Sequence, residues 1–174
     1  TGIIAVEATA KAAPDGYTLL TTGNELVLMK LLYRKLGFDP LGDLTPVGLM
    51  ARAPSVLFVH ESVPATSLKE FIAYIREQPG KLNYGSPGTG HGYHIAMEMF
   101  LHSTGGKMVH VPYKGTALVM QDMFAGRIHA MMYLPGAQLL EQVNRGVLRV
   151  LAAGSGKRLP NLPRVPTFDE GGVA

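Results

Sequence analysis

The sequence predicts an α/β fold, in which helices cover the faces of a β-sheet, and two observations support this prediction. Short runs with strand character alternate with longer segments of helical periodicity along most of the chain. Of the 174 residues, 47% are hydrophobic, which is enough apolar surface to offset the entropy of an ordered chain and argues against disorder. No apolar run approaches the ~18 residues of a membrane span, so we expect no membrane insertion.

The first third of the chain already alternates between the two kinds of segment. Residues 3–13 are rich in alanine and favour a helix, which the turn residues Pro14-Asp15-Gly16 end. Residues 25–35 repeat apolar residues three and four apart, which indicates a second helix. In order, we expect a helix over 3–13, a strand over 17–22, a helix over 25–35, a loop over 37–46 and a strand over 55–60.

The rest of the chain continues the alternation after a clear helix start. Ser67-Leu68-Lys69-Glu70 is a capping box, in which the serine and the glutamate satisfy each other's backbone donors. The helix that it opens ends at Pro79-Gly80, a turn signal. Beyond it we expect strands over 82–85, 108–111, 127–134 and 147–153, and helices over 92–103, 116–125 and 138–144.

The chain has 21 glycines and 12 prolines, which is more than usual for its length. Many of them lie where an expected strand ends. In parallel α/β sheets such junctions gather at the carboxyl edge of the strands, where helix N-termini present unpaired N–H groups and a positive dipole end. Together the junctions predict a pocket for a carboxylate or phosphate, although each alone is better explained as a tight turn. They are Thr22-Gly23-Asn24, Gly85 to Gly92, Lys114-Gly115-Thr116, Pro135-Gly136-Ala137 and Gly154-Ser155-Gly156.

Sharper motifs fail when their spacing is tested. The glycines between 85 and 92 lack the spacing of a dinucleotide fingerprint, and His91 stands where a P-loop needs lysine. Neither Ser86 nor Ser155 lies in a nucleophile elbow. The absence of cysteine excludes disulfides and thiolate sites, and the pair His91 and His94 lacks a carboxylate at the spacing of a metal site. We therefore expect no cofactor and no metal.

The charge of the chain and two further polar residues bear on its possible ligands and partners. The net charge of +3 comes from scattered residues without a basic stripe, so we expect no nucleic-acid partner. His110 lies inside an expected strand and is interpreted as a buried core histidine. Lys114 lies in a junction, where a cation can neutralise an acid, although a solvated loop lysine fits equally well.

Four strings of residues are specific enough to indicate a family. They are Lys11 to Leu20, Pro79 to Ser86 followed by the glycine loop and His94, Val111 to Gly115, and Leu162 to Thr167 with Glu170 and Gly172. In this order and spacing the chain resembles the Bug family, the periplasmic solute receptors of tripartite tricarboxylate transporters. The resemblance runs through essentially all 174 residues.

The resemblance implies a two-lobed, Venus-flytrap binding protein of the periplasm that is not an enzyme. Its ligand would be a small carboxylate or an amino acid, held largely by backbone amides and small hydroxyls, and its partners would be membrane transporter subunits. Carried over one position at a time, the implied ligand-binding residues are Thr22, Asn24, Gly85, Ser86, Gly88, Thr89, Gly90, His94, Lys114, Gly115, Thr116 and Ser155.

The same resemblance implies how the chain divides. We expect a partial first lobe from residues 1–58 and 150–174, and a whole second lobe from residues 59–149. The first lobe is expected to be incomplete because members of the family have an earlier strand with a Pro/Gly-rich loop, and closing helices near their end. This chain begins after the former and stops before the latter.

Two other classes of function stay open on the residues alone. One is a hydrolase-like enzyme in which His91 or His94 activates Ser86, with Glu98 one helical turn past His94 to orient it. The other is an interaction domain that serves dimerisation through exposed apolar surface. Replacing Ser86 separates the enzyme from the receptor, because the change abolishes turnover in the first and only weakens ligand affinity in the second.

Overall fold

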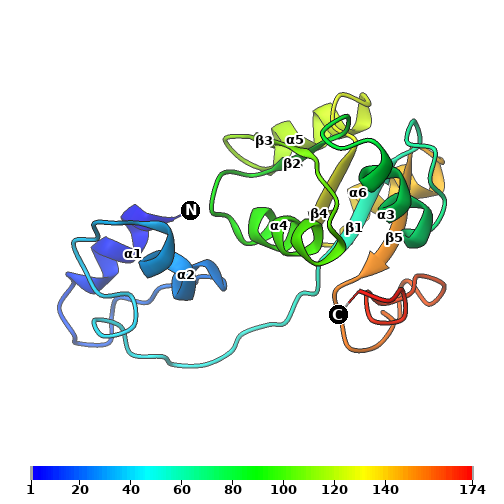
Figure 1. Cartoon of the computed structure of the whole chain (residues 1–174). Helices are drawn as coiled ribbons and strands as arrows, with labels where there is room; N and C mark the ends of the chain where they lie inside the picture. Colours follow the sequence, from blue (N-terminus) through cyan, green and yellow to red (C-terminus); the bar gives the residue numbers. More distant parts are fainter. Residues whose placement is uncertain (1, 174) are drawn as a thin grey trace. The chain divides into compact units, whose positions relative to one another are not determined.

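The computed structural model describes residues 2–173 and divides the chain into two compact units (Figure 1). The first unit runs to Arg52 and takes in Gly90–Gly92. The second comprises Ala53–Thr89 and the chain from Tyr93 onward. Each unit has hydrophobic core residues of its own, so the two are described in turn.

The first unit contains two short helices, α1 (Ile3–Ala10) and α2 (Glu25–Leu32), in otherwise irregular chain. Its core cluster has three buried hydrophobic side chains, which are Val6, Met29 and Phe38. Both helices confirm the sequence prediction, although each ends before the expected residue. The loop expected over 37–46 is also present.

The strand expected over residues 17–22 does not form. A strand needs a neighbour to pair its N–H and C=O groups, and the five strands of the sheet all lie in the second unit. Tyr17 and Leu19 are accordingly exposed, with 93% and 74% of their surface accessible. The prediction is wrong here because β-favouring residues cannot supply the partner that a strand requires.

The second unit is built on one sheet of five strands, all of which the sequence predicts. They are β1 (Val56–His60), β2 (Asn83–Ser86), β3 (Val109–Pro112), β4 (Ala130–Tyr133) and β5 (Leu148–Ala153). Their order in the sheet is β3-β2-β4-β1-β5. β2 pairs in parallel with β3 and β4, whereas β1 pairs antiparallel with β4 and β5. The sheet is therefore mixed.

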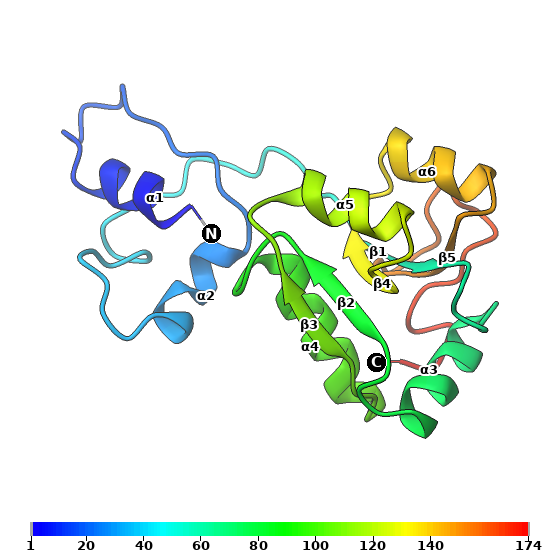
Figure 2. The same ribbon diagram turned by 90° about the horizontal axis from the view of Figure 1, so that it is seen from above.

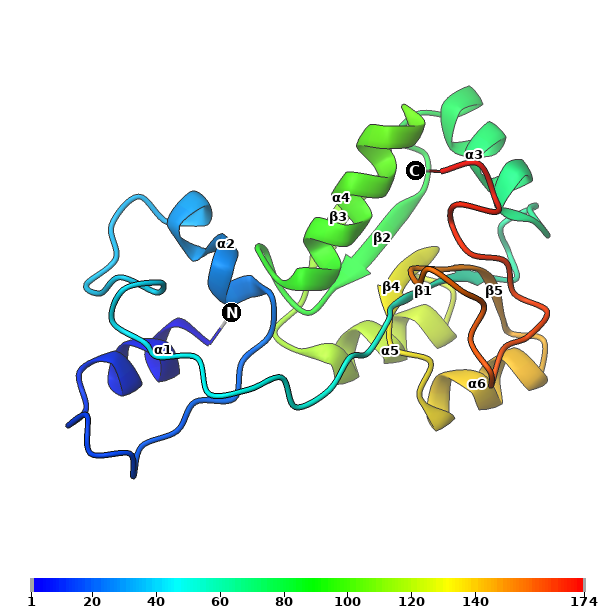
Figure 3. The same cartoon turned by 90° about the horizontal axis from the view of Figure 1, so that it is seen from below.

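Four helices cover the two faces of this sheet: α3 (Leu68–Glu77), α4 (Gly92–Thr104), α5 (Thr116–Phe124) and α6 (Ala137–Asn144). α3 and α4 pack on one face, and α5 and α6 on the other (Figure 2, Figure 3). Alternation along β1 assigns its side chains: Leu57 and Val59 pack under α3 and α4, and Val56 and Phe58 under α5 and α6. The predicted α/β fold is confirmed.

The start of α3 shows how the sequence sets a helix boundary. Ser67 Oγ accepts a hydrogen bond from the Glu70 backbone N–H at 3.2 Å, as a capping box requires. The Glu70 carboxylate in turn accepts hydrogen bonds from the backbone N–H and the hydroxyl of Thr66, at 2.7 and 2.8 Å. These hydrogen bonds from Thr66 lower the pKa of Glu70. The hydrogen bonds of the capping box therefore include Thr66, one residue before the N-cap Ser67.

The compact units are a different division of the chain from the expected lobes, which stay a prediction. β1 and β5 pair with each other in the same sheet as β2, β3 and β4. Beyond β5, Thr167 forms a parallel bridge with Ala153. The first unit runs to Arg52, and the described chain from residue 150 onward belongs to the second unit.

Gly85→Ala tests the close packing between β2 and α5. Gly85 lies inside β2, and a Cβ atom there would come within 2.6 Å of Cγ1 of Val119, a fully buried side chain. We expect the variant to lower the free energy of unfolding by about 1–3 kcal/mol, the usual cost of overpacking, in urea denaturation. Gly156→Ala is the control, since a Cβ there meets nothing within 4 Å. Equal losses in both variants would contradict this account.

Amide hydrogen exchange should also separate the two units. The core of the first unit is small, whereas the second unit has buried hydrophobic residues on both faces of its sheet. Local opening is easier where few apolar side chains are buried, so we expect the amides of α1 and α2 to exchange at least about tenfold faster than those of α3 and β1. Exchange followed by mass spectrometry measures this, and equal protection would show the expectation to be wrong.

Candidate functional site

Four of the five predicted junctions lie at one edge of the sheet. Because β1 runs antiparallel to β4 and β5, those two strands share the direction of β2 and β3. Tyr133 and Ala153, the last residues of β4 and β5, both lie opposite Val56. Ser86 and Pro112, the last residues of β2 and β3, lie opposite each other. The carboxyl ends of all four strands therefore share an edge, where α4, α5 and α6 begin.

The junction after β2 is tied to a buried serine. Ser86 is fully buried, and its Oγ accepts a hydrogen bond from the Gly88 N–H at 3.3 Å and lies 3.1 Å from the Gly88 carbonyl oxygen. The same Oγ lies 2.7 Å from Nε2 of His110. Gly88 has a φ of +152°, which L side chains rarely adopt. The serine hydroxyl thus holds both polar backbone atoms of this glycine.

His110 on β3 belongs to a cluster of three rings that stack against one another. Its ring centroid lies 4.0 Å from that of His94 on α4 and 4.9 Å from that of Tyr84 on β2. The Tyr84 hydroxyl donates a hydrogen bond to the carboxylate of Glu98. Burial lowers the pKa of His94, and burial together with the neighbouring His94 lowers the pKa of His110 to about 4. Both imidazoles are therefore neutral at pH 7.

The junction after β3 combines a cation with a helix start. Lys114 is exposed, Gly115 has a φ of +123° and caps α5, and Thr116 is the first residue of that helix. Immediately before them, the Tyr113 hydroxyl donates a hydrogen bond of 2.6 Å to Oδ2 of Asp122 on α5. This hydrogen bond fastens the end of β3 to the helix that follows it.

The two remaining junctions differ from each other in shape. After β5, the Ser155 hydroxyl donates a hydrogen bond to the Lys157 carbonyl at 2.7 Å, so this serine stabilises its own turn. Beside the start of α6 lies a hollow of about 270 Å³. Its lining is mostly apolar and comprises Ala53, Pro54, Leu134, Pro135, Gly136, Leu159 and Asn161. No local pattern in the sequence indicates this hollow, because its lining residues come from three separate parts of the chain.

Most of the residues implied by the family resemblance lie at this edge: Ser86, Gly88, Thr89, His94, Lys114, Gly115, Thr116 and Ser155. Gly85 lies inside β2 against Val119, which gives a packing reason for a glycine at that position. Thr22, Asn24 and Gly90 belong to the first unit. That these residues bind a ligand stays a prediction.

From the sequence, His110 is expected only to be a buried core histidine, and its contact with Ser86 is not predicted. The apolar and polar alternation around it indicates a strand, and a histidine inside a strand is usually a satisfied core residue. The parallel register places His110 opposite Tyr84 and one diagonal step from Ser86. That register cannot be read from the chain, so no local signal identifies the contact between His110 and Ser86.

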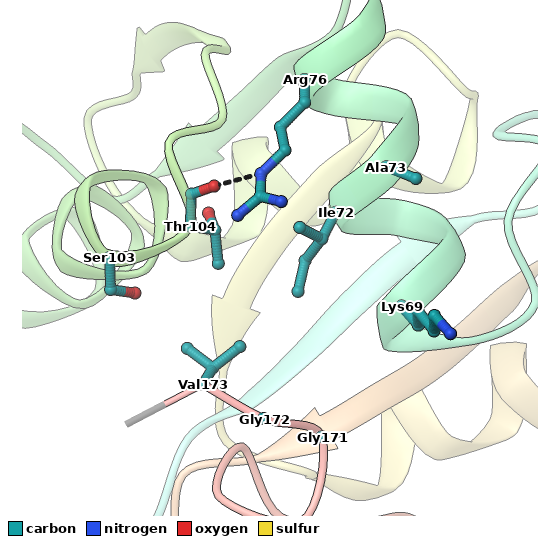
Figure 4. Close-up of a pocket in the computed structure, with 9 residues that line it drawn as sticks. All are labelled: Lys69, Ile72, Ala73, Arg76, Ser103, Thr104, Gly171, Gly172 and Val173. Carbon is teal, nitrogen blue, oxygen red and sulfur yellow. Dashed lines mark hydrogen bonds between the residues drawn. The ribbon is translucent and has the colours of Figure 1, made fainter.

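A larger pocket lies elsewhere on the second unit (Figure 4). It has a volume of about 490 Å³ and is lined by Lys69, Ile72, Ala73, Arg76, Ser103, Thr104, Gly171, Gly172 and Val173. Arg76 Nε donates a hydrogen bond to the Thr104 carbonyl across it. Thr104 ends α4, so this pocket lies at the opposite end of that helix from the glycine-rich junctions.

Two kinds of feature are absent from the part of the chain between residue 2 and residue 173. Within it, no helix combines the length and apolar character that crossing a membrane needs. Within the same residues, no group of three or more His, Asp or Glu side chains could hold a metal ion.

The fold and the edge define a class of protein, namely an α/β binding domain whose strand ends and helix starts converge on glycine-rich junctions. The chain belongs to the family described as the tripartite tricarboxylate transporter family receptor, whose model matches residues 1–174. The resemblance seen in the sequence is thereby confirmed.

Individual relatives agree with this assignment. Protein BugT of Bordetella pertussis is 34% identical over 171 residues, which cover 97% of this chain and 52% of BugT. An R. palustris protein solved with adipate is 38% identical with a TM-score of 0.87, and the periplasmic binding protein BugD is 29% identical with a TM-score of 0.87. Each match covers 99% of this chain and 57% of the solved chain. The chain thus spans about half the length of these relatives.

Tyr113→Phe tests the clamp between β3 and α5. The hydrogen bond from Tyr113, with a smaller contribution from Arg127, lowers the pKa of Asp122, and burial with the same hydrogen bond raises the pKa of Tyr113 to about 12. We expect the variant to raise the pKa of Asp122 towards its ordinary value in a carboxyl NMR titration. Stability from a lowered carboxylate pKa is lost as the pH falls through that pKa, so acid unfolding should begin at higher pH.

Tyr74→Phe is the matched control for this titration. Tyr74 is also half-buried, and it lies on α3, on the other face of the sheet. Its loss should leave the pKa of Asp122 unchanged. An unchanged Asp122 in the Tyr113 variant would show that Arg127 alone sets the pKa.

Proposed function

We propose that this chain acts as a periplasmic solute-binding receptor that captures a small carboxylate or amino acid and delivers it to the membrane subunits of a tripartite transporter. The observation that supports this most is the convergence of glycine-rich junctions and the starts of α4, α5 and α6 on one edge of the sheet. The family membership and the relative solved with adipate support the same class of ligand.

The electrostatics of the edge favour an anion. None of the proposed ligand-binding residues is acidic, and Lys114 is the one lysine or arginine among them. Helix N-termini add a positive dipole end and backbone N–H groups without an intrahelical partner. The neutral imidazoles of His94 and His110 can hydrogen-bond without adding charge. Backbone amides thus supply most of the attraction, and they suit a carboxylate.

The proposed mechanism follows from these donors. A ligand carboxylate accepts hydrogen bonds from backbone N–H groups of Thr89 and of the Gly115-Thr116 segment, and Lys114 neutralises its charge. In this proposal Thr22 and Asn24 line the first lobe, and Gly90 belongs to the ligand loop of the second lobe. Closure of the lobes then buries the ligand. The lobe limits of residues 1–58 with 150–174, and 59–149, are part of this proposal.

The enzyme alternative is less well supported. Ser86 is fully buried, and its hydroxyl is engaged by Gly88 and His110, whereas a nucleophile must reach its substrate. The lowered pKa of His110 makes its imidazole a weak general base. The family and the solved neighbours are solute-binding receptors. Replacing Ser86 is therefore expected to alter ligand affinity and no turnover.

Isothermal titration tests the proposal directly. The full-length gene product is titrated with adipate and with a panel of mono-, di- and tricarboxylates and amino acids, and adipamide serves as the uncharged control. We expect heat with at least one acid and none with adipamide. The absence of heat with every acid in the panel would count decisively against a carboxylate receptor.

Lys114→Gln tests the electrostatic part of the mechanism. Losing a charge-assisted contact should weaken the binding of the preferred acid about tenfold, with less effect at high salt, where exposed charges are screened. Lys107→Gln is the matched control, because Lys107 is also exposed and precedes β3 at the opposite edge of the sheet. Similar weakening in both variants would indicate a general charge effect rather than a contact at the site.

A further inference from the structure

His110 connects three elements that border the proposed site. Its Nε2 lies 2.7 Å from Oγ of Ser86 at the end of β2, and its ring stacks against those of His94 in the first turn of α4 and of Tyr84 on β2. Ser86 holds both polar backbone atoms of Gly88. A single side chain on β3 is therefore linked to the loop after β2 and to the start of the helix that follows it.

The chemistry of these contacts is that of a neutral imidazole. The titratable and polar groups that face His110 are His94 and Glu98 from α4, and Tyr84 and Ser86 from β2. Burial and the facing His94 outweigh the attraction of Glu98, so the pKa of His110 is about 4. Because the one proton of the Ser86 hydroxyl is donated to the Gly88 carbonyl oxygen, Nε2 of the neutral ring donates to Oγ of Ser86.

We propose that His110 is a positioning residue for the ligand loop, acting through Ser86 to hold Gly88 so that the backbone that follows lies in the geometry that receives a carboxylate, and this rests on the proposed function. Gly88 has a φ of +152°, and a glycine is free to leave that region unless something holds it. The hydrogen bonds from Ser86 supply the restraint. His110 in turn fixes the serine, so that the loop is ordered before ligand arrives, which reduces the ordering cost of binding.

Two substitutions separate hydrogen bonding from packing at this position. His110→Phe keeps a flat ring for stacking on His94 and Tyr84 and removes the polar atom that reaches Ser86. His110→Gln keeps an amide nitrogen at about the reach of Nε2 and removes the ring. His102→Gln is the control, because His102 is exposed near the end of α4 and far along that helix from Gly88.

The first measurement is ligand affinity of the full-length gene product by isothermal titration with adipate or the preferred acid. We expect His110→Phe to weaken binding at least about tenfold, His110→Gln to stay within about threefold, and His102→Gln to leave it unchanged. Ser86→Ala should weaken binding as much as His110→Phe. The double variant should be no weaker than either single one, because both act through one hydrogen bond.

The second measurement needs no ligand. Amide exchange at Gly88, followed by NMR, reports directly whether the loop is held. We expect His110→Phe and Ser86→Ala to speed this exchange several-fold while amides of α3 keep their protection, and His110→Gln to leave it nearly unchanged. Thermal unfolding of each variant shows whether a loss reflects the loop or the whole unit.

The outcomes separate this inference from the proposed function. If the unsubstituted protein binds no acid, the receptor proposal fails, and Gly88 exchange still decides whether His110 holds the loop. If the protein binds an acid and His110→Phe binds it equally well with unchanged Gly88 exchange, the positioning role is overturned. If His110→Phe fails to fold, normal ligand affinity in Ser86→Ala overturns the positioning role as well. The role is also overturned if the losses of affinity in Ser86→Ala and His110→Gln multiply in the double variant.

Discussion

The direction of β1 is the constraint on which the rest of the second unit depends. β1 lies between β4 and β5 and runs against both, so β4 and β5 are forced to share the direction of β2 and β3. A reversed β5 would carry its following turn to the other end of the sheet. Because β1 is buried on both faces, its residues also form part of both cores, and the position of the junctions is tied to the most protected strand.

The edge that results is held mainly by hydrogen bonds, and the one ion pair that adjoins them joins Asp122 to the exposed Arg127. Ser86 and His110 are joined without a charge, and Tyr113 reaches a carboxylate on the neighbouring helix. The ion pairs among the described residues lie on the surface, where solvent screens them and each contributes little. At such an edge the backbone N–H groups are not paired with charged side chains. A ligand carboxylate therefore competes with few other anions for these N–H groups.

Local signals predict most of the elements, and non-local pairing explains what they miss. The Ser67 capping box and the hydrophobic periodicity place α3, and short apolar runs bounded by turn residues place the five strands, because these signals act within a few residues. The segment at 17–22 has the same strand character, yet it lacks a partner and stays irregular. The contacts of His110 and Gly85 are missed for a related reason: the register of β2 against β3 and the approach of α5 decide their surroundings, and both join distant parts of the chain.

The outer strands of the sheet have a consequence for association. β3 ends at Pro112, which has no N–H to offer to a further strand. At the other side, Ala153 of β5 is already bridged in parallel to Thr167, so the chain itself occupies the end of that border. Unprotected outer strands are where sheets of separate molecules join and aggregate. Each outer strand therefore has one end at which strand addition is hindered, which favours recognition through the loops over growth of the sheet.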